Sequence, residues 1–107
     1  MASTDKPKRA FIVLVDDFSD PGALDRRLAS RSEHLVQATR KHEKGVLVSA
    51  GAMLDSHESG RMVGSALTIN ADSEEEVMEL LRSDPYTVGR AWNLDSVKII
   101  PYRPASF

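Results

Sequence analysis

The order in which β-rich and helical segments follow one another restricts the fold of this chain more than any other feature. Apolar runs rich in β-branched residues predict strands over residues 10–15, 46–50 and 62–69, and a fourth strand over 95–102. Pro101 lies near the end of the last run, and proline in a sheet is confined to edge strands or to the ends of pairing. The last strand is therefore predicted at such a position.

Two helices are predicted between these strands. The first begins at Asp20-Pro21-Gly22, because aspartate is a good N-cap and proline suits the first helical position, and it ends before Gly45. Residues spaced by three, four and seven form its apolar stripe: Leu24, Leu28, Leu35, Ala38 and His42. The second helix begins at the capping box Ser73-Glu74-Glu75-Glu76. It ends at Asp84-Pro85, since the residue before a proline disfavours the helical conformation.

The resulting order, β-α-β-β-α-β, is that of a ferredoxin-like α+β fold, with two helices on one face of an antiparallel sheet. The chain has 107 residues, which suits one domain, expected over residues 9–107 after a disordered lead-in over 1–8. The second face of the sheet would remain open, although the runs 11–15 and 46–48 are apolar. A second copy of the chain packed sheet to sheet would cover that face, so a homodimer is predicted.

The composition argues against several kinds of partner. The net charge is −2, and acidic residues interrupt the basic pairs Arg26-Arg27 and Arg40-Lys41, which indicates a solvated helix face and not a nucleic-acid-binding surface. No apolar run approaches transmembrane length, and the first residues lack the apolar region of a signal peptide. We therefore expect a cytoplasmic protein that binds neither nucleic acid nor a membrane.

No metal site and no cofactor are predicted. The chain has no cysteine, so disulfides and thiolate chemistry are excluded. The three histidines show no close ligand spacing: His42 falls on the apolar stripe and is interpreted as structural, and His57 lies in a polar loop. Residues 60–64 do not lead from a strand into a helix, which a phosphate-binding loop requires.

Two titratable residues stand out by their settings. His34 lies within the first predicted helix, and Asp84 lies in Asp84-Pro85-Tyr86, where the second helix ends. If the fold brings them together, they form a His–Asp dyad suited to proton transfer near neutral pH. An aspartate at a helix C-terminus opposes the helix dipole, and an ion pair with His34 or Arg31 would compensate for that. The simpler interpretation is a boundary histidine and a helix-terminating aspartate that bonds local backbone N–H groups.

Three further side chains are candidates for binding a substrate. Arg31 shares a helix face with Leu28 and Leu35, so its guanidinium is drawn inward and would clamp a carboxylate or an enolate. Alternatively, its stem covers apolar surface while its head reaches water. Tyr86 and Trp92 would line a pocket, or they would anchor the core or an interface, as large aromatic residues commonly do.

Small residues in the strands are candidates as well. Gly51 and Gly64 would leave room for a ligand, and Ser65 would offer it a hydroxyl group. Glycine in a strand more often marks a bulge or a point where another backbone approaches closely. Both interpretations stay open from the sequence.

Four short motifs, in this order, resemble the YCII family of YciI-like proteins. They are Arg31-x-x-His34, the segment Gly-Val-Leu-Val-Ser-Ala-Gly-Ala over 45–52, Gly60-Arg61-Met62-x-Gly64-Ser65, and Asp84-Pro85-Tyr86. The resemblance extends from about Ala10 to Tyr102, and the ordered set is more specific than any one of the motifs.

This resemblance implies a ferredoxin-like α+β protein that forms dimers related to the dimeric α/β-barrel group. It also implies that the helix histidine, His34, and the aspartate of Asp-Pro-Tyr, Asp84, form a catalytic pair. Most members of the family have no assigned reaction, and a related enzyme of chlorinated-aromatic degradation eliminates HCl. The segments 90–93 and 55–60 would border the pocket, so the identity of the substrate does not carry over.

Three hypotheses for the function follow. The first is a cofactor-free acid–base enzyme that eliminates, isomerises or hydrolyses a small organic molecule, with His34 as base and Asp84 orienting it; it predicts an open pocket beside His34. The second is a non-catalytic small-molecule-binding module, which predicts a pocket closed to bulk water. The third is a structural dimer without turnover, which predicts no pocket there.

Overall fold

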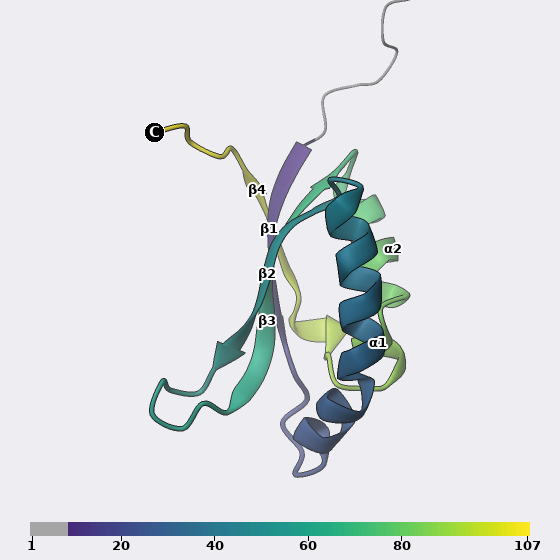
Figure 1. Cartoon of the computed structure of the whole chain (residues 1–107), viewed down its shortest axis with the longest axis vertical. Helices are drawn as coiled ribbons and strands as arrows, with labels where there is room; N and C mark the ends of the chain where they lie inside the picture. Colours follow the sequence, from purple (N-terminus) through teal and green to yellow (C-terminus); the bar gives the residue numbers. More distant parts are fainter. Residues whose placement is uncertain (1–8) are drawn as a thin grey trace, which may run out of the picture.

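Four strands form one antiparallel sheet in the order β2-β3-β1-β4 (Figure 1). The structure is a computed structural model and describes residues 9–107; the predicted lead-in over 1–8 lies outside the described residues. The strands are β1 (Arg9–Asp16), β2 (Leu47–Leu54), β3 (Met62–Ala71) and β4 (Lys98–Tyr102). Pro101 therefore lies in an edge strand, as predicted.

Both long helices lie on the same face of the sheet (Figure 1). The helical elements are α1 (Ala23–Glu43), α2 (Glu74–Arg82), α3 (Pro85–Val88) and the single 3-10 turn η1 (Leu94–Ser96). The element order and the one-sided placement of the helices confirm the predicted ferredoxin-like α+β fold. The two short elements, α3 and η1, were not predicted, and they lie in the stretch that connects α2 to the last strand.

Local hydrogen bonds explain where the elements begin and end. Gly45 has a φ of 78°, the left-handed conformation predicted for the residue that stops α1. Ser73 Oγ accepts from the N–H of Glu76 at 3.1 Å, which confirms the predicted cap of α2. The last strand begins at Lys98 and not at residue 95, because Asn93 accepts from the N–H of Asp95 and caps η1. The second strand continues through Gly51 to Leu54.

The start of α1 differs from the prediction. The helix begins at Ala23 with Gly22 as N-cap, and the Asp20 carboxylate instead accepts from the Gly22 N–H at 3.1 Å. The Arg26 guanidinium donates to the two oxygens of the same carboxylate at 2.8 and 2.7 Å. The hydrogen bonds from Arg26, with a smaller contribution from Gly22, lower the pKa of Asp20 from 3.8 to about 2.

We expect Asp20→Asn to destabilise the fold slightly at neutral pH, and we expect this difference to disappear as the pH falls below about 2. The pKa of Asp20 in the folded state lies below its unfolded value, so the carboxylate stabilises the fold fully above pH 3.8. That contribution is lost as the pH falls through about 2. Thermal denaturation of variant and wild type across this range measures the difference, with Asp25→Asn on the same helix as control. A difference that does not change with pH would contradict the ion pair.

The core lies between the sheet and the helices. β1 and β3 supply its centre and α2 covers it, through residues such as Phe11, Val13, Val15, Leu67, Ile69, Val77 and Leu81. Gly64 allows close packing at one end of this sheet, because a Cβ atom there would lie 2.5 Å from the carbonyl oxygen of Val15. The sequence allowed a close backbone approach as one explanation of this glycine, and the structure supports that explanation.

The face that α1 buries is not the predicted leucine stripe. The buried residues of α1 are Ala23, Arg27 and His34, whereas Leu28 and Leu35 are 50% and 44% exposed. Arg27 and His34 each precede one of these leucines, so the buried face is rotated by about 100° from the predicted one. Polar side chains occupy the buried positions because they find partners in the interior, as described next.

Candidate functional site

His34 and Asp84 meet in the interior, although 50 positions separate them in the sequence. Nδ1 of His34 lies 2.8 Å from Oδ1 of Asp84, and the two side chains are 9% and 7% exposed. A carboxylate accepts hydrogen bonds, so Nδ1 of His34 is the donor in this contact, and in a neutral imidazole with this tautomer Nε2 would be the nitrogen with the lone pair. The predicted contact between the two residues is confirmed.

The carboxylate of Asp84 also bonds a local backbone N–H, as the simpler sequence interpretation stated, but it does so at the start of a further helix that was not predicted. Helix α2 ends at Arg82, and Asp84 is the N-cap of α3, where its Oδ1 accepts from the N–H of Tyr86 at 2.8 Å. Pro85 occupies the first position of α3, which suits a residue without an N–H. The carboxylate is therefore in a favourable capping position for α3, and Asp84 also directly follows Ser83, the C-cap of α2, as predicted. Lys41 Nζ lies 4.0 Å from its other oxygen, Oδ2.

Two buried aromatic rings hold the plane of the histidine. The Tyr86 ring stacks on His34 with centroids 3.9 Å apart and an angle of 17° between the planes. Trp92 meets both rings edge to face, at centroid distances of 5.6 and 5.4 Å. Burial raises the pKa of Tyr86, and the charges of Arg27 and Arg31 oppose that rise. Tyr86 therefore keeps its phenolic proton at neutral pH.

Arg27 is the functional candidate that sequence reasoning missed. Predicted on a solvated face, it is instead 3% exposed, and its Nη1 donates to both carboxylate oxygens of Asp17 at 2.9 and 3.1 Å. Its Nη2 donates to Ser65 Oγ at 2.9 Å, and its guanidinium carbon lies 4.6 Å from the centroid of the Tyr86 ring. The seven-residue spacing from Arg27 to His34, two helical turns, was the available signal that both share one face.

The ion pair between Arg27 and Asp17 is costly to bury. Desolvation raises the pKa of the Asp17 carboxyl, and it outweighs the lowering effect of the neighbouring Arg27 charge. Within residues 9–107, Arg27 Nε is also the one buried side-chain nitrogen or oxygen without a hydrogen-bond partner. Such an unpaired donor costs about 1–3 kcal/mol.

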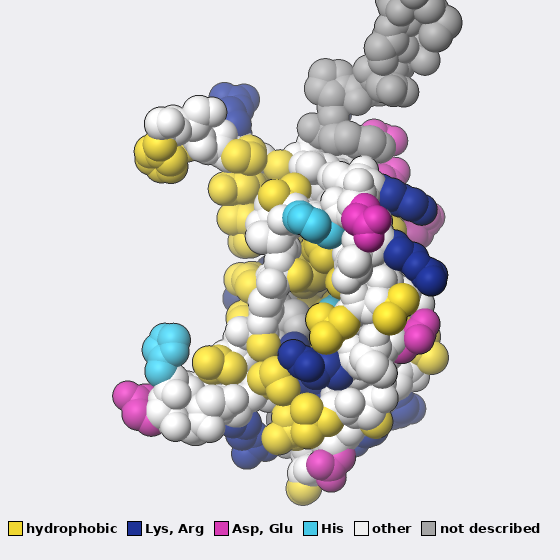
Figure 2. Space-filling view, viewed as in Figure 1, with side chains coloured by type: hydrophobic (Ala, Val, Ile, Leu, Met, Phe, Trp, Pro, Cys, Tyr) yellow, Lys and Arg dark blue, Asp and Glu magenta, His cyan; other side chains and the backbone are white. Residues whose placement is uncertain are grey.

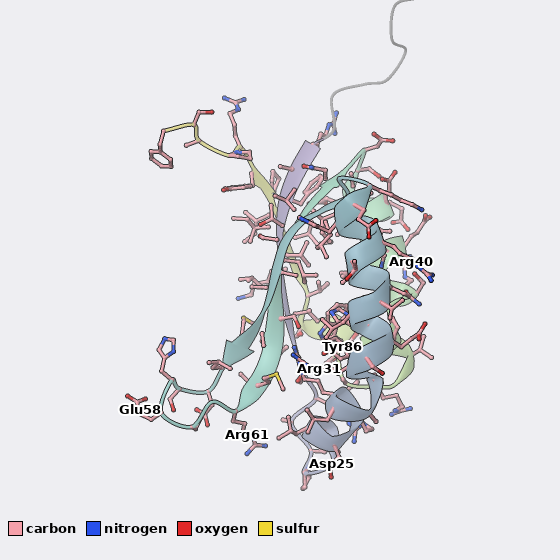
Figure 3. The ribbon with its side chains drawn as sticks, viewed as in Figure 1. Asp25, Arg31, Arg40, Glu58, Arg61 and Tyr86 are labelled. Carbon is pink, nitrogen blue, oxygen red and sulfur yellow. The ribbon has the colours of Figure 1, made fainter. Side chains whose placement is uncertain are left out.

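A cavity of about 220 Å³ lies beside the dyad, between α1 and the strands β2 and β3. Its lining includes five of the predicted site residues: Arg31, His34, Gly51, Ser65 and Tyr86. Figure 2 shows a hollow between α1 and the sheet with basic side chains at one end, and Figure 3 labels Arg31 and Tyr86 in the same region. Neither Trp92 nor Asp84 lines this cavity; Trp92 Nε1 instead donates to Ser65 Oγ at 3.1 Å.

A second cavity lies on the other side of the dyad. It measures about 20 Å³, room for roughly one water molecule, and His34, Lys41, Asp84 and Trp92 are among its lining residues. The larger cavity is thus the one with space for a substrate.

The remaining histidines lie apart from the dyad. His42 Nδ1 is 2.8 Å from the carbonyl oxygen of Leu47, a contact between α1 and β2, and His57 is exposed in the β2–β3 loop. In the part of the chain that the structure describes, no group of three or more histidine or acidic side chains is arranged to hold a metal ion. None of the helices between residues 9 and 107 combines the length and apolarity needed to span a membrane.

Comparison with known proteins assigns the family. The model of the YCII-related domain matches residues 11–101, nearly all of the residues that form the sheet and its helices. The chain belongs to the YCII family. This confirms the family to which the sequence motifs pointed.

Two curated relatives of this YCII protein come from Emericella nidulans. Aspercryptin biosynthesis cluster protein B is 34% identical over 99 residues, which cover 88% of this chain and 62% of that protein. Derivative of benzaldehyde biosynthesis cluster protein C is 38% identical over 78 residues, which cover 68% of this chain and 80% of that protein. The chain thus spans less than two thirds of the first relative.

A solved structure shares the fold of this YCII protein. It is 5-chloro-2-hydroxyhydroquinone dehydrochlorinase (TftG) from Burkholderia phenoliruptrix AC1100, in complex with 2,5-dihydroxybenzoquinone. The match has a TM-score of 0.73 and covers 90% of this chain and 95% of the other, at 22% sequence identity. At that identity the likeness establishes the common fold.

Proposed function

We propose that this YCII protein is a cofactor-free acid–base enzyme that acts on a small organic molecule, with His34 as the general base and Asp84 as the residue that orients it. The observation that carries the proposal is the buried 2.8 Å contact between His34 Nδ1 and Asp84 Oδ1, next to a cavity of about 220 Å³. A histidine oriented in this way beside free space is the minimum required for proton transfer to a bound molecule.

The chemistry follows from the two ends of the imidazole. Asp84 accepts a hydrogen bond from the Nδ1–H of His34, so Nε2 is the basic atom, and no hydrogen bond to it from a side chain or backbone group is found among residues 9–107. Nε2 takes a proton from a C–H or O–H group of the substrate, and the carboxylate stabilises the imidazolium that forms. Return of the proton to another atom of the substrate gives isomerisation, and departure of a leaving group from the deprotonated substrate gives elimination. Abstraction from a water molecule would give hydrolysis.

The size of the cavity and the comparisons support a small substrate. A volume of about 220 Å³ is larger than the roughly 150 Å³ of an apolar cavity that binds benzene, so it suits a compound with a single ring. The structural neighbour is a dehydrochlorinase that holds a monocyclic quinone, and two relatives are biosynthesis cluster proteins. Arg31, Ser65, Gly51 and Tyr86 would contact the substrate, while Trp92 would act through Ser65 and His34. The cavity also disfavours the third hypothesis, which expects no pocket beside His34.

Catalysed exchange of hydrogen for deuterium tests the function without knowledge of the natural substrate. We expect the protein in D₂O to accelerate exchange at the acidic C–H positions of small cyclic enolisable ketones, measured by proton NMR. His34→Gln should abolish the acceleration, because its amide cannot act as a base at neutral pH. Binding of the same compounds without exchange would overturn the enzyme hypothesis in favour of a binding module.

We further propose a homodimer through the open face of the sheet. Because Phe11, Val13 and Val15 face the core, the alternating residues Ile12 and Leu14 face the other side, which Figure 1 shows free of helices. Ile100 pairs with Ile12 and is 42% exposed. An apolar face of this kind needs a cover in water.

Sedimentation equilibrium at micromolar concentration is expected to give about twice the chain mass of 11.8 kDa. Ile12→Asp should give a monomer, since it buries a charge in the proposed interface. The matched change Leu28→Asp on α1 lies on an exposed helix face and should leave the dimer intact. A monomeric wild-type protein would remove the proposal.

A further inference from the structure

We propose that Arg27, anchored by Asp17, fixes the hydroxyl of Ser65 as a hydrogen-bond donor into the cavity, so that the site selects ligands that present an anionic oxygen there. The proposal rests on the proposed function, in which the cavity beside His34 is the site of the ligand. It assigns Arg27 the part of a positioning residue, and it gives the ligand a chemical class: a carboxylate, an enolate or a phenolate on a small planar framework.

The direction of the Ser65 hydroxyl follows from its partners. A hydroxyl has one hydrogen and can accept two hydrogen bonds. Arg27 Nη2 lies 2.9 Å from Ser65 Oγ and Trp92 Nε1 lies 3.1 Å from it, and these two nitrogens can only donate. Both accepting positions of Oγ are therefore occupied.

The hydrogen of this hydroxyl is left for a ligand. Among residues 9–107 no acceptor for the Ser65 O–H is found, and Ser65 lines the cavity while being 4% exposed to solvent. A buried donor without a protein partner beside a cavity is suited to an acceptor that arrives with the substrate. Ser65 thus distinguishes a ligand oxygen that accepts from a ligand group that only donates.

The anchoring of Arg27 favours a positioning role. Nη1 contacts both oxygens of Asp17, Nη2 contacts Ser65, and the cation lies over the ring of Tyr86. The same arrangement leaves Nε buried without a partner and keeps Asp17 in a site that disfavours its charge. A pair selected for stability alone would not need either feature. In this position Arg27 donates a hydrogen bond to Ser65 Oγ, so the hydrogen of the Ser65 hydroxyl is directed into the cavity.

The charges around the cavity agree with an anionic ligand. Asp17 balances Arg27, and in the described part of the chain Arg31 has no carboxylate within ion-pair distance. The exposed Arg31 guanidinium on the cavity wall therefore contributes an unbalanced positive charge. A negative charge that develops when His34 removes a proton would be stabilised by Arg31 and by the Ser65 donor together.

Benzoate and benzamidine provide a matched pair of probes for titration calorimetry. Both are planar and of similar size, but benzoate only accepts hydrogen bonds and benzamidine only donates them. We expect the wild-type protein to bind benzoate at least tenfold more tightly than benzamidine. Ser65→Ala should weaken benzoate binding about tenfold, the effect of losing one hydrogen bond to a charged oxygen, and should leave benzamidine unchanged.

Variants of the two donors test the positioning role. Trp92→Phe frees one accepting position of Ser65 Oγ and lets the hydroxyl turn. It should therefore lower the affinity for benzoate a few-fold without changing the affinity for benzamidine. Arg27→Lys keeps the charge but cannot reach Asp17 and Ser65 together, so it should also lower affinity for benzoate alone. If the role of Arg27 were only structural, Arg27→Lys would weaken the binding of both probes equally, and that outcome would overturn the proposal. If Arg27→Lys does not fold, the binding data of Trp92→Phe and Ser65→Ala decide between the two roles.

The two proposals can fail separately. Equal affinity for the two probes, or an unchanged benzoate affinity in Ser65→Ala, would overturn the role of Arg27 while deuterium exchange by His34 still stood. Selective benzoate binding without any catalysed exchange would support this inference and overturn the proposed enzyme.

Discussion

Replacement of Asp17 by alanine is expected to lower the free energy of unfolding by about 3–5 kcal/mol, because it leaves the buried Arg27 without its counter-charge. Arg27 and Asp17 are 3% and 4% exposed, so water cannot take the place of the lost carboxylate. Urea denaturation followed by the fluorescence of Trp92, the single tryptophan of the chain, measures the change close to the affected network.

Two controls isolate the ion pair. Asp16→Ala removes the adjacent acidic residue, which is exposed, and should change the free energy of unfolding by less than about 0.5 kcal/mol. The double variant Asp17→Leu with Arg27→Met removes both charges and should recover most of the loss. A loss below about 1 kcal/mol in Asp17→Ala would show that Arg27 does not depend on Asp17.

Asp84→Asn is expected to reduce catalysed deuterium exchange by about 10²–10⁴-fold while the fold persists. Asparagine is an equally good N-cap for α3, and its amide oxygen can accept from both His34 Nδ1 and the N–H of Tyr86. It lacks the negative charge that stabilises the imidazolium, so the loss falls on proton transfer and not on the fold. Exchange rates and thermal denaturation, measured on the same samples, separate the two.

Asp20→Asn is the matched control for this change, since it removes a carboxylate that accepts from the Gly22 N–H just before α1, outside the cavity. Its exchange rate should equal that of the wild-type protein. An unchanged rate in Asp84→Asn would mean that His34 acts without the carboxylate, and the dyad would then be only a structural contact.

The periodicity of the sequence was enough to predict the fold. Strands and capped helices carry local signals, such as the Ser73 cap and the left-handed Gly45, and these signals agree with the observed elements. The contact between His34 and Asp84 followed from family resemblance together with two unusual settings. The prediction depended on such local signals, and it therefore missed helix α3, whose four residues are too few to form a recognisable helical pattern.

The rotation of α1 could not be predicted from hydropathy. Leu28 and Leu35 resemble a buried stripe, yet the residues just before them, Arg27 and His34, face the interior. A buried charge is tolerable only with a partner, and the partners Asp17 and Asp84 come from distant parts of the chain. Pairing over such distances leaves no trace in the periodicity of one helix.

The tripeptide Asp84-Pro85-Tyr86 supplies the contacts to His34, whereas other segments form the opposite wall of the cavity. One turn of chain supplies the carboxylate that contacts His34, the proline that fixes the turn, and the ring that stacks on the imidazole. The opposite wall of the cavity comes from β2 and β3, through residues that include Gly51. Substitutions in β2 and β3 can therefore change the shape of that wall while the contact between His34 and Asp84 stays the same.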